Sequence, residues 1–494
     1  MIASGADLES ANPLVTVHPL ARQIQRYALF VTLVKYDSLL SPSPYFARAW
    51  QWSADRRALT LELAADLRWH DGTATTAQDV AFTIRAARDP ATGFFRRGDL
   101  RDVSDVEVHN DTSLTIAFAA SQARFPLVLC ELPIAPRHIL RDVPPAAMRG
   151  HAFATAPVGN GPFRFLERRP RQRWVFVADT NFPAALGGPP RTRRLVVAVV
   201  DEATTKFAGL VSGDLDMAGI APTMAELTAS DPQLAVLTYP VAFTNALVFN
   251  TERPPFDDPR VRRAIDASIN RSRIIDVALA GYGTVAQGPI PPGHPLARLV
   301  KRAPRDPGAI LDSAGWKRGT GTWRERDGKP LRFTLRTVGS GDNALEQLIQ
   351  ADLRLQGIQV EIQQMELGAF LSDARAEPKR FEALVTGIPG DVSLSHVAAM
   401  FETSQRGGAL DYSGFHRPDF DALLQRAREA PNDEEQRQAW VAIEEALVVE
   451  APIVWLYHSQ GVQGVRRSVR GVLMDLRGEL VSVAQWYQAD TSAR

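Results

Sequence analysis

The sequence has a single cysteine, no long apolar run and no excess of either charge. Because Cys130 has no second cysteine to pair with, the chain forms neither an intramolecular disulfide nor a cysteine-based zinc site. No apolar stretch approaches the roughly 20 residues that span a bilayer as a helix. The 56 basic and 56 acidic residues cancel, which removes the global attraction typical of nucleic-acid-binding proteins. We therefore expect no membrane span and no nucleic-acid partner.

Motifs of catalysis and cofactor binding are also missing. The nine histidines show no HExxH or similar metal-binding spacing, and no GxSxG nucleophile elbow is present. The pair Gly159 and Gly161 lacks the third glycine of GxGxxG and any following Lys-Ser/Thr. We predict no metal, no cofactor and no enzymatic activity. The competing class is a hydrolase, such as a peptidase or glycosidase, for which no activatable nucleophile or spaced carboxylate pair is visible.

The length of the chain predicts more than one domain. Its 494 residues are too many for one ordinary core, so two or three domains are expected. The first residues, MIASGADLESANPL, have neither the charged start nor the apolar centre of a signal peptide. Two interpretations stay open at this point. Either the protein is intracellular, or an export or lipoprotein leader precedes this stretch in the native protein.

Three segments carry strong local signals. The first, Arg68–Ile84, reads RWHDGTATTAQDVAFTI and contains a DG turn. Thr76, followed three residues later by Asp79, is a variant of the capping box ahead of an amphipathic pattern. We predict a helix from about Ala77.

The other two segments also combine chain breaks with helix or strand signals. Val158–Phe165, VGNGPFRF, breaks the chain sharply before a strand. Val248–Gly283, VFNTERPPFDDPRVRRAIDASINRSRIIDVALAGYG, places prolines ahead of a helix that begins near Arg260. A second helix then begins at Asn270, a good N-cap, and ends at Gly281.

Taken together and in this order, the three segments resemble the family 5 extracellular solute-binding proteins of ABC importers, which include peptide, nickel and opine binders. The resemblance runs from about Ala47 to Val472. It implies a bilobal α/β protein of the type II periplasmic-binding-protein kind, with the additional domain of the cluster C architecture. The implied parts are lobe I over 1–43, 155–243 and 472–494, the additional domain over 44–154, and lobe II over 244–471.

Periodicity predicts further elements. Ala58–Leu63 alternates as a half-buried strand does, and Val106–Ala119 repeats that pattern around a turn, which predicts a hairpin. Residues 331–362 read as strand, helix and strand, with Asp342 as the helix cap, so a parallel pair is expected. Another strand, Phe381–Thr386, should lead into a loop.

The resemblance points to Asp391 as a ligand anchor. In the family's peptide binders this strand is followed by a Trp-x-x-Asp-Tyr-Pro-Asp-Pro pattern, whose first Asp pairs with the peptide α-amino group. Asp391 matches that charged position, whereas Ile388 replaces the Trp, Val392 replaces the Tyr, and the Pro-Asp-Pro is absent. A carboxylate facing an ammonium group in a desolvated cleft gives strong recognition. A solvated loop aspartate is the alternative.

Other residues are weaker candidates for ligand binding. Phe243 and Asn245 lie where family members carry residues that bond the ligand backbone. Arg406 precedes two glycines, in a loop where an arginine can meet a ligand carboxylate bidentately. Five more side chains are candidates for the cleft wall, with burial in a core as the alternative: Phe94, Phe95, Trp455, Tyr457 and His458.

The function implied by the resemblance is that of an extracytoplasmic receptor, periplasmic or lipid-anchored, whose leader has been removed. It would act as a monomer, close on a di- or oligopeptide or a peptide-like solute between its lobes, and deliver it to the transmembrane subunits of an ABC permease. An opine, an oligosaccharide or a nickel chelate are alternative ligands of the same scaffold. A regulatory or chaperone-like binding domain is a third interpretation.

Overall fold

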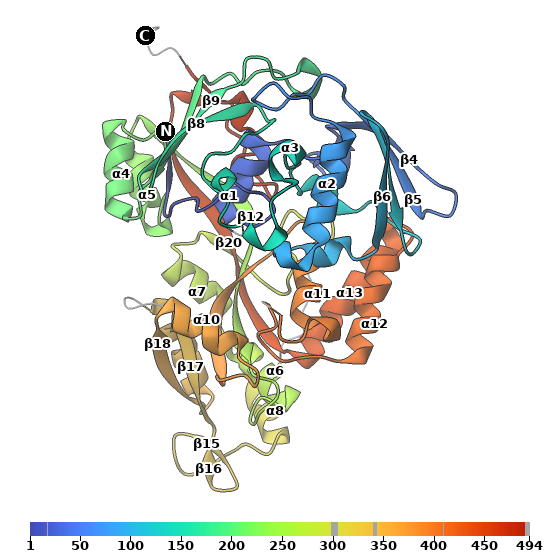
Figure 1. Ribbon diagram of the computed structural model, residues 1–494. Coiled ribbons are helices and arrows are strands. Elements are labelled where there is room, and N and C mark those ends of the chain that lie inside the picture. Colours follow the sequence, from blue (N-terminus) through green and yellow to red (C-terminus); the bar gives the residue numbers. More distant parts are fainter. Residues whose placement is uncertain (17, 298–304, 339–342, 409, 490–494) are drawn as a thin grey trace. The chain divides into compact units, whose positions relative to one another are not determined.

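The protein folds into two compact units. The first consists of Met1–Tyr239 and Gly461–Arg494, and the second of Pro240–Gln460. The chain passes between them within two strands, β12 (Leu234–Phe249) and β20 (Ile453–Arg466), which can be followed in Figure 1. The structure is a computed structural model that describes residues 1–16, 18–297, 305–338, 343–408 and 410–489.

The mixture of helices and sheets confirms the predicted α/β class. The predicted second lobe, 244–471, starts four residues after the second unit begins and runs past its end at Gln460. The predicted additional domain, 44–154, lies within the first unit.

The larger sheet of the first unit combines parallel and antiparallel strands. Its order is β20-β11-β1-β10-β9-β8, in which β1 pairs parallel with both of its neighbours and β9 pairs antiparallel with β8 and β10. The continuous apolar run of β10 suits a strand in the middle of a sheet. The strands are β1 (Ile2–Ser4), β8 (Phe163–Arg169), β9 (Arg173–Ala178), β10 (Arg194–Val199) and β11 (Met217–Gly219).

A second sheet of the first unit confirms the predicted strand and hairpin. Its order is β4-β5-β7-β6, and all its pairs are antiparallel. Alternate residues of β5 are buried, as the sequence predicts, and α2 packs against β6 (Figure 1). The elements are β4 (Ala47–Trp52), β5 (Ala58–Leu63), α2 (Ala77–Arg88), β6 (Val103–Asn110) and β7 (Ser113–Phe118).

The capping box at the start of α2 is present as predicted. The side-chain oxygen of Thr76 accepts from the backbone of α2, and the Asp79 carboxylate accepts from the Thr76 amide at 2.9 Å. The second carboxylate oxygen of Asp79 accepts from the Arg137 amide at 2.9 Å. Asp79 therefore joins α2 to the start of α3 (Arg137–Leu140).

The first two sequence segments meet in the first unit. The Asn160 side chain accepts from the Val31 amide at 3.0 Å, and the Nε2 atom of His70 lies 2.9 Å from the Gly161 carbonyl. A Cβ atom on Gly159 would lie 2.0 Å from the Leu29 carbonyl oxygen, so only glycine allows this approach. These contacts hold the backbone of the two segments in place.

The second unit has a sheet of order β18-β17-β19-β12-β20, with β13 beside β20. Strands β17 and β18 are parallel and α9 connects them, which confirms the predicted strand-helix-strand unit. Asp342, the predicted cap of that helix, lies outside the described residues. The elements are β13 (Gly283–Val285), β17 (Arg332–Val338), α9 (Ala344–Leu355), β18 (Gln359–Met365) and β19 (Ala383–Pro389).

The prediction that the strand ends at Thr386 is wrong, because β19 continues to Pro389. Its last residues pair with β12, where Asn245 faces Gly387 and Phe243 faces Pro389. Pairing with a neighbouring strand, which no local pattern records, extends β19 beyond the glycine.

Helices cover both faces of the second unit's sheet. Ala246 and Val248 of β12 belong to one apolar cluster, and Leu247 and Phe249 to the other, as the alternation of a strand requires. Helices α6 (Pro259–Ser268), α7 (Arg271–Ala278), α8 (Pro307–Ser313) and α9 contribute to the second cluster, and α10 (Leu367–Arg375), α11 (Ser395–Phe401), α12 (Pro418–Glu429) and α13 (Asp433–Glu450) to the first.

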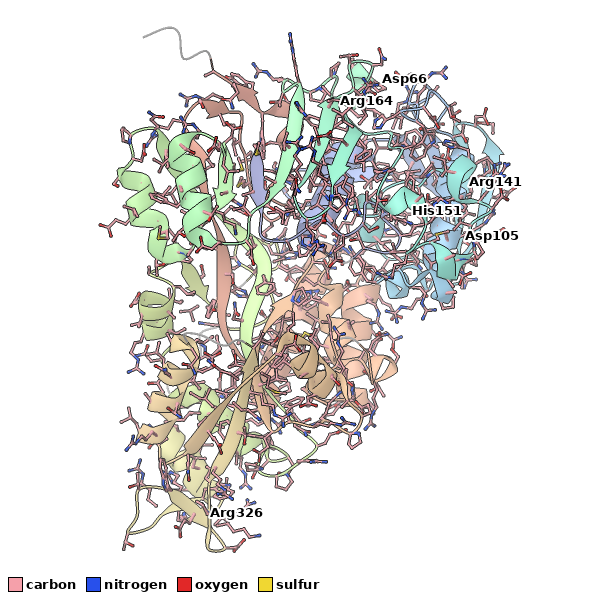
Figure 2. All side chains as sticks on the ribbon, turned by 60° about the vertical axis from the view of Figure 1, so that its left-hand side comes forward. Asp66, Asp105, Arg141, His151, Arg164 and Arg326 are labelled. Carbon is pink, nitrogen blue, oxygen red and sulfur yellow. The ribbon has the colours of Figure 1, made fainter. Side chains whose placement is uncertain are left out.

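The third sequence segment forms α6 and α7, close to the predicted bounds. Asn270 caps α7 by accepting from the Arg273 amide at 3.0 Å, and Gly281 has φ 85°, as a C-terminal stop requires. Arg326, labelled in Figure 2, lies on a small sheet of the same unit, which consists of β14 (Lys317–Arg318), β15 (Arg324–Arg326) and β16 (Lys329–Pro330). Its guanidinium carbon lies 4.6 Å from the centre of the Trp316 ring.

Candidate functional site

One edge of the second unit's sheet gathers most of the predicted site residues. The parallel strands β17 and β19 end at this edge, and β12 and β20 pass it. In open α/β sheets, ligands bind outside the carboxyl ends of the strands. Five of the predicted side chains lie on or beside this edge: Phe243, Asn245, Asp391, Tyr457 and His458.

Phe243 presents an aromatic surface at this edge. The side chain is 39% exposed, although it is a large apolar group. A Cβ atom on Gly387 would lie 2.1 Å from the Cζ atom of Phe243, which shows that the ring lies directly over this glycine. The absence of a side chain at Gly387 therefore leaves room for the outer end of the ring.

Asn245 lies two residues further along β12 and so points to the same face of the sheet as Phe243. Its amide donates to the Ser459 hydroxyl at 3.0 Å. The amide and the hydroxyl are both uncharged, and both act as donor and acceptor. Ser459 was not predicted, because only the pairing of distant strands brings it beside Asn245.

Asp391 is held by its own loop. Oδ1 accepts from the Ser393 hydroxyl and, at 3.1 Å, from the Ser395 amide. Oδ2 accepts from the Ser395 hydroxyl at 3.0 Å and from the His396 amide at 3.1 Å. These two amides begin α11, so the carboxylate caps that helix. The side chain is 10% exposed. Its role as a ligand anchor stays a prediction.

Three buried histidines surround this loop and the neighbouring strand. His294 accepts from the Leu296 amide at Nδ1 (3.1 Å), so its proton is on Nε2, which donates to the Val392 carbonyl at 2.9 Å. Burial lowers the pKa of His294. His396 accepts from the Asp391 amide at 3.4 Å, and its Nδ1 atom also lies 3.4 Å from the Asp391 carboxylate.

His458 faces away from Phe243 and Asn245. Its Nδ1 atom lies 2.9 Å from the hydroxyl of Thr244, which alternates with them along β12. Burial, and then the neighbouring His396, lower its pKa from 6.5 to about 4, so the ring is neutral at pH 7. Tyr457 belongs to the core cluster that contains Leu456, and burial raises its pKa to about 12. Both residues are buried, so neither offers an open surface.

Arg406 lies elsewhere in the second unit. Its guanidinium donates to the Glu252 carboxylate at 2.8 Å, and its side chain is 60% exposed. Its predicted contact with a ligand carboxylate stays a prediction.

Phe94 and Phe95 belong to the first unit. Their rings meet edge to face with centres 5.4 Å apart, and Phe94 is buried whereas Phe95 is exposed. The Arg22 guanidinium carbon lies 4.2 Å from the centre of the Phe95 ring. Both phenylalanines line a small hollow together with Arg22, Arg96 and Glu131.

A buried group of charges beside these rings was missed by the sequence reasoning. The Glu131 carboxylate lies 2.6 Å from Arg96 and 3.7 Å from both Arg22 and Arg26. It also accepts from the Tyr36 hydroxyl at 2.9 Å. These residues are dispersed through the sequence, which gives no spacing signal that could have found the group.

Within the described parts of the chain, no cluster of three His, Cys, Asp or Glu side chains is suited to hold a metal ion. Among the same residues, no helix is long and apolar enough to cross a membrane.

A sheet edge with an exposed aromatic ring and uncharged hydrogen-bonding groups, in an α/β protein of two units, is typical of proteins that bind small molecules. The chain belongs to the bacterial extracellular solute-binding proteins, family 5: the family model described as "Bacterial extracellular solute-binding proteins, family 5 Middle" matches residues 41–407. The family consists of substrate-binding proteins and not of enzymes.

Three relatives illustrate the membership. Protein XP55 of Streptomyces lividans is 28% identical over 438 residues, which cover 87% of this chain and 78% of the relative. The nickel-binding periplasmic protein of Escherichia coli (strain K12) is 29% identical over 350 residues, covering 68% and 65%. The oligopeptide-binding protein AppA of Bacillus subtilis (strain 168) is 24% identical over 476 residues, covering 93% and 86%.

Solved structures share the fold. NikZ from Campylobacter jejuni, in complex with Ni(L-His), matches with a TM-score of 0.84 at 22% identity and covers 99% of both chains. AppA from Bacillus subtilis, in complex with a nonapeptide, matches with a TM-score of 0.84 at 23% identity and covers 99% of this chain and 98% of its own.

Proposed function

We propose that this protein is the extracytoplasmic receptor of an ABC importer, that it captures a di- or oligopeptide or a peptide-like solute, and that it delivers the solute to the permease. The observation that carries the proposal is the grouping of Phe243, Asn245 and Ser459 at the carboxyl edge of the second unit's sheet in a family 5 chain. The relative named as an oligopeptide-binding protein supports a peptide-like ligand.

The proposed mechanism is closure of the two units on the solute. The chain passes between the units only twice among the described residues, within β12 and β20, so rotation about two strand segments suffices. The solute stabilises the closed state by contacts that it makes in that state alone. The receptor acts as a periplasmic or lipid-anchored monomer, and residues 44–154 form the family-specific additional domain.

A thermal-shift screen tests the proposal. The purified protein is heated with dipeptides, oligopeptides, opines, oligosaccharides and nickel-histidine, because a solute that binds only the folded state raises the melting temperature. We expect the melting temperature to rise with the concentration of a peptide or peptide-like solute. Calorimetry should then show binding of that solute without its turnover. Absence of a shift with every class, in protein freed of co-purified solute, would contradict the receptor function.

A nickel chelate is the second candidate solute. It is favoured by the 29% identical relative named as a nickel-binding periplasmic protein, together with the imidazole of His396 at the start of α11. Neutral imidazole is the commonest metal ligand in proteins, and His396 is the donor that this candidate requires. Titration with nickel-histidine, compared with histidine alone and with a His396→Ala variant, tests this candidate.

A further inference from the structure

The loop after β19 decides what kind of group a solute can present to the second unit. An ionised carboxylate has about four acceptor positions. In Asp391, the Ser393 hydroxyl and the Ser395 amide occupy Oδ1, and the Ser395 hydroxyl and the His396 amide occupy Oδ2. The loop itself therefore supplies at least four hydrogen bonds to this carboxylate.

An ammonium group would therefore have to displace one of these donors. Two of them are the first amides of α11, and leaving a buried amide without a hydrogen-bond partner is unfavourable. With the side chain only 10% exposed, water does not easily replace the lost partner. Glu346, a carboxylate close to Tyr457, is also buried and accepts from the Thr337 hydroxyl at 2.6 Å.

Among the described residues, three accessible groups at this edge are uncharged: Phe243, Asn245 and Ser459. Phe243 offers an exposed aromatic ring whose outer end lies against Gly387. Asn245 and Ser459, on the same face of the sheet, keep further donor and acceptor capacity beyond the bond that joins them. An apolar face for stacking beside neutral polar groups is the chemistry of an amide or hydroxyl-bearing solute, not of an ammonium ion.

We propose, on the basis of the proposed receptor function, that the solute meets the second unit through uncharged groups: an apolar face stacks on Phe243, and a hydroxyl or amide group binds to the Asn245–Ser459 pair. The solute needs no free amino group. An amino-blocked or internal peptide segment and an oligosaccharide share this chemistry.

Paired probes test the proposal by isothermal titration calorimetry. Two probes are the free-amine and N-acetylated forms of the tripeptide Ala-Phe-Ala. The third probe is the disaccharide cellobiose. We expect the acetylated peptide, the disaccharide or both to bind, and acetylation to change the Kd of the peptide by less than threefold. A free-amine peptide that binds at least tenfold more tightly than its acetylated form would overturn the proposal.

Variants connect the result to the named residues. Phe243→Ala should weaken the probe that binds by about tenfold with little change in Tm, whereas Leu355→Ala, which removes an exposed side chain from the end of α9, should leave the Kd unchanged. Asp391→Asn should lower the Tm while the ratio of the two peptide affinities stays constant. A preference for the free amine that disappears in Asp391→Asn would restore the anchor role and overturn the proposal.

The failure of this proposal is distinguishable from that of the receptor function. If neither peptide form nor the disaccharide binds, the proposal is wrong. A shift in the thermal screen with nickel-histidine or an opine would then keep the receptor function, and the absence of any shift would remove both.

Discussion

The hydrogen-bond partners of the Asp391 side chain determine what it does in the structure. Its carboxylate accepts from two hydroxyls and two amides of the loop that follows it. The charge for which the resemblance predicts a ligand contact also accepts hydrogen bonds from the first two amides of α11. These bonds stabilise the start of that helix.

We expect Asp391→Ala to lower the free energy of unfolding by about 1–2 kcal/mol, because α11 loses its cap and two amides lose their acceptor. Urea unfolding of the two proteins measures the difference. Asp276→Ala, an exposed aspartate within α7, is the matched control and should change stability little. Equal stability of Asp391→Ala and the parent protein would mean that water replaces the cap.

His458 makes stability depend on pH. Its pKa is about 4 in the folded protein, against 6.5 for an unburied histidine, so the unfolded state binds more protons between these values. Stability is therefore fully present above about pH 6.5 and falls as the pH decreases toward 4, by up to about 3 kcal/mol from this group. In His458→Gln, the free energy of unfolding should change less between pH 7 and pH 5. An unchanged pH dependence would show that His458 does not titrate as its burial requires.

Among the elements, α2 depends on Asp79 more than on Thr76. Thr76 serves only the first turn of α2, whereas Asp79 also accepts from the Arg137 amide at the start of α3. Asp79 is buried, so its loss exposes two amides to an apolar surrounding.

We expect Thr76→Ala to cost about 1 kcal/mol and Asp79→Ala about 2–3 kcal/mol, since the second change removes acceptors from two helices. Urea unfolding followed by circular dichroism measures both costs. If the two variants lose equal stability, the bond from Arg137 contributes nothing and α3 is held by other contacts.

The loop that precedes β8 depends on the missing side chain of Gly159. Gly159→Ala should cost about 1–3 kcal/mol, because the new Cβ atom would lie 2.0 Å from the Leu29 carbonyl oxygen and the backbone would have to move. Gly98→Ala is the matched control, since a Cβ atom there meets nothing within 4 Å. The melting temperatures of the two variants measure the difference. Equal melting temperatures would contradict the close approach of Gly159 to the Leu29 carbonyl.

At the scale of the whole molecule, the path of the chain connects the two units at two places. Among the described residues, the chain passes between the two units only within β12 and β20. Each unit contains its own strands and buried core. A solute that contacts both units therefore acts on an equilibrium between states of the whole protein.

We expect a solute present at 100 times its Kd to stabilise the protein by about 2.7 kcal/mol and to reduce its radius of gyration. Small-angle X-ray scattering with and without the solute measures the second effect, and a solute that fails to bind serves as the control. Stabilisation without any change in the radius of gyration would support binding to one unit alone.

The helices and strands predicted above follow from local patterns in the sequence. The capping box at Thr76, the N-cap at Asn270 and the alternation in Ala58–Leu63 record interactions between residues a few positions apart, so the local pattern contains them. The α/β class and the family follow from three such segments in order.

The site was decided only by the tertiary structure. The extension of β19 to Pro389, the contact of Phe243 with Gly387 and the bond from Asn245 to Ser459 all require strands that are distant in the sequence to lie in register. The group formed by Glu131 and its arginines has the same origin. A residue's neighbours across a sheet depend on the packing of the whole unit, which no local spacing specifies.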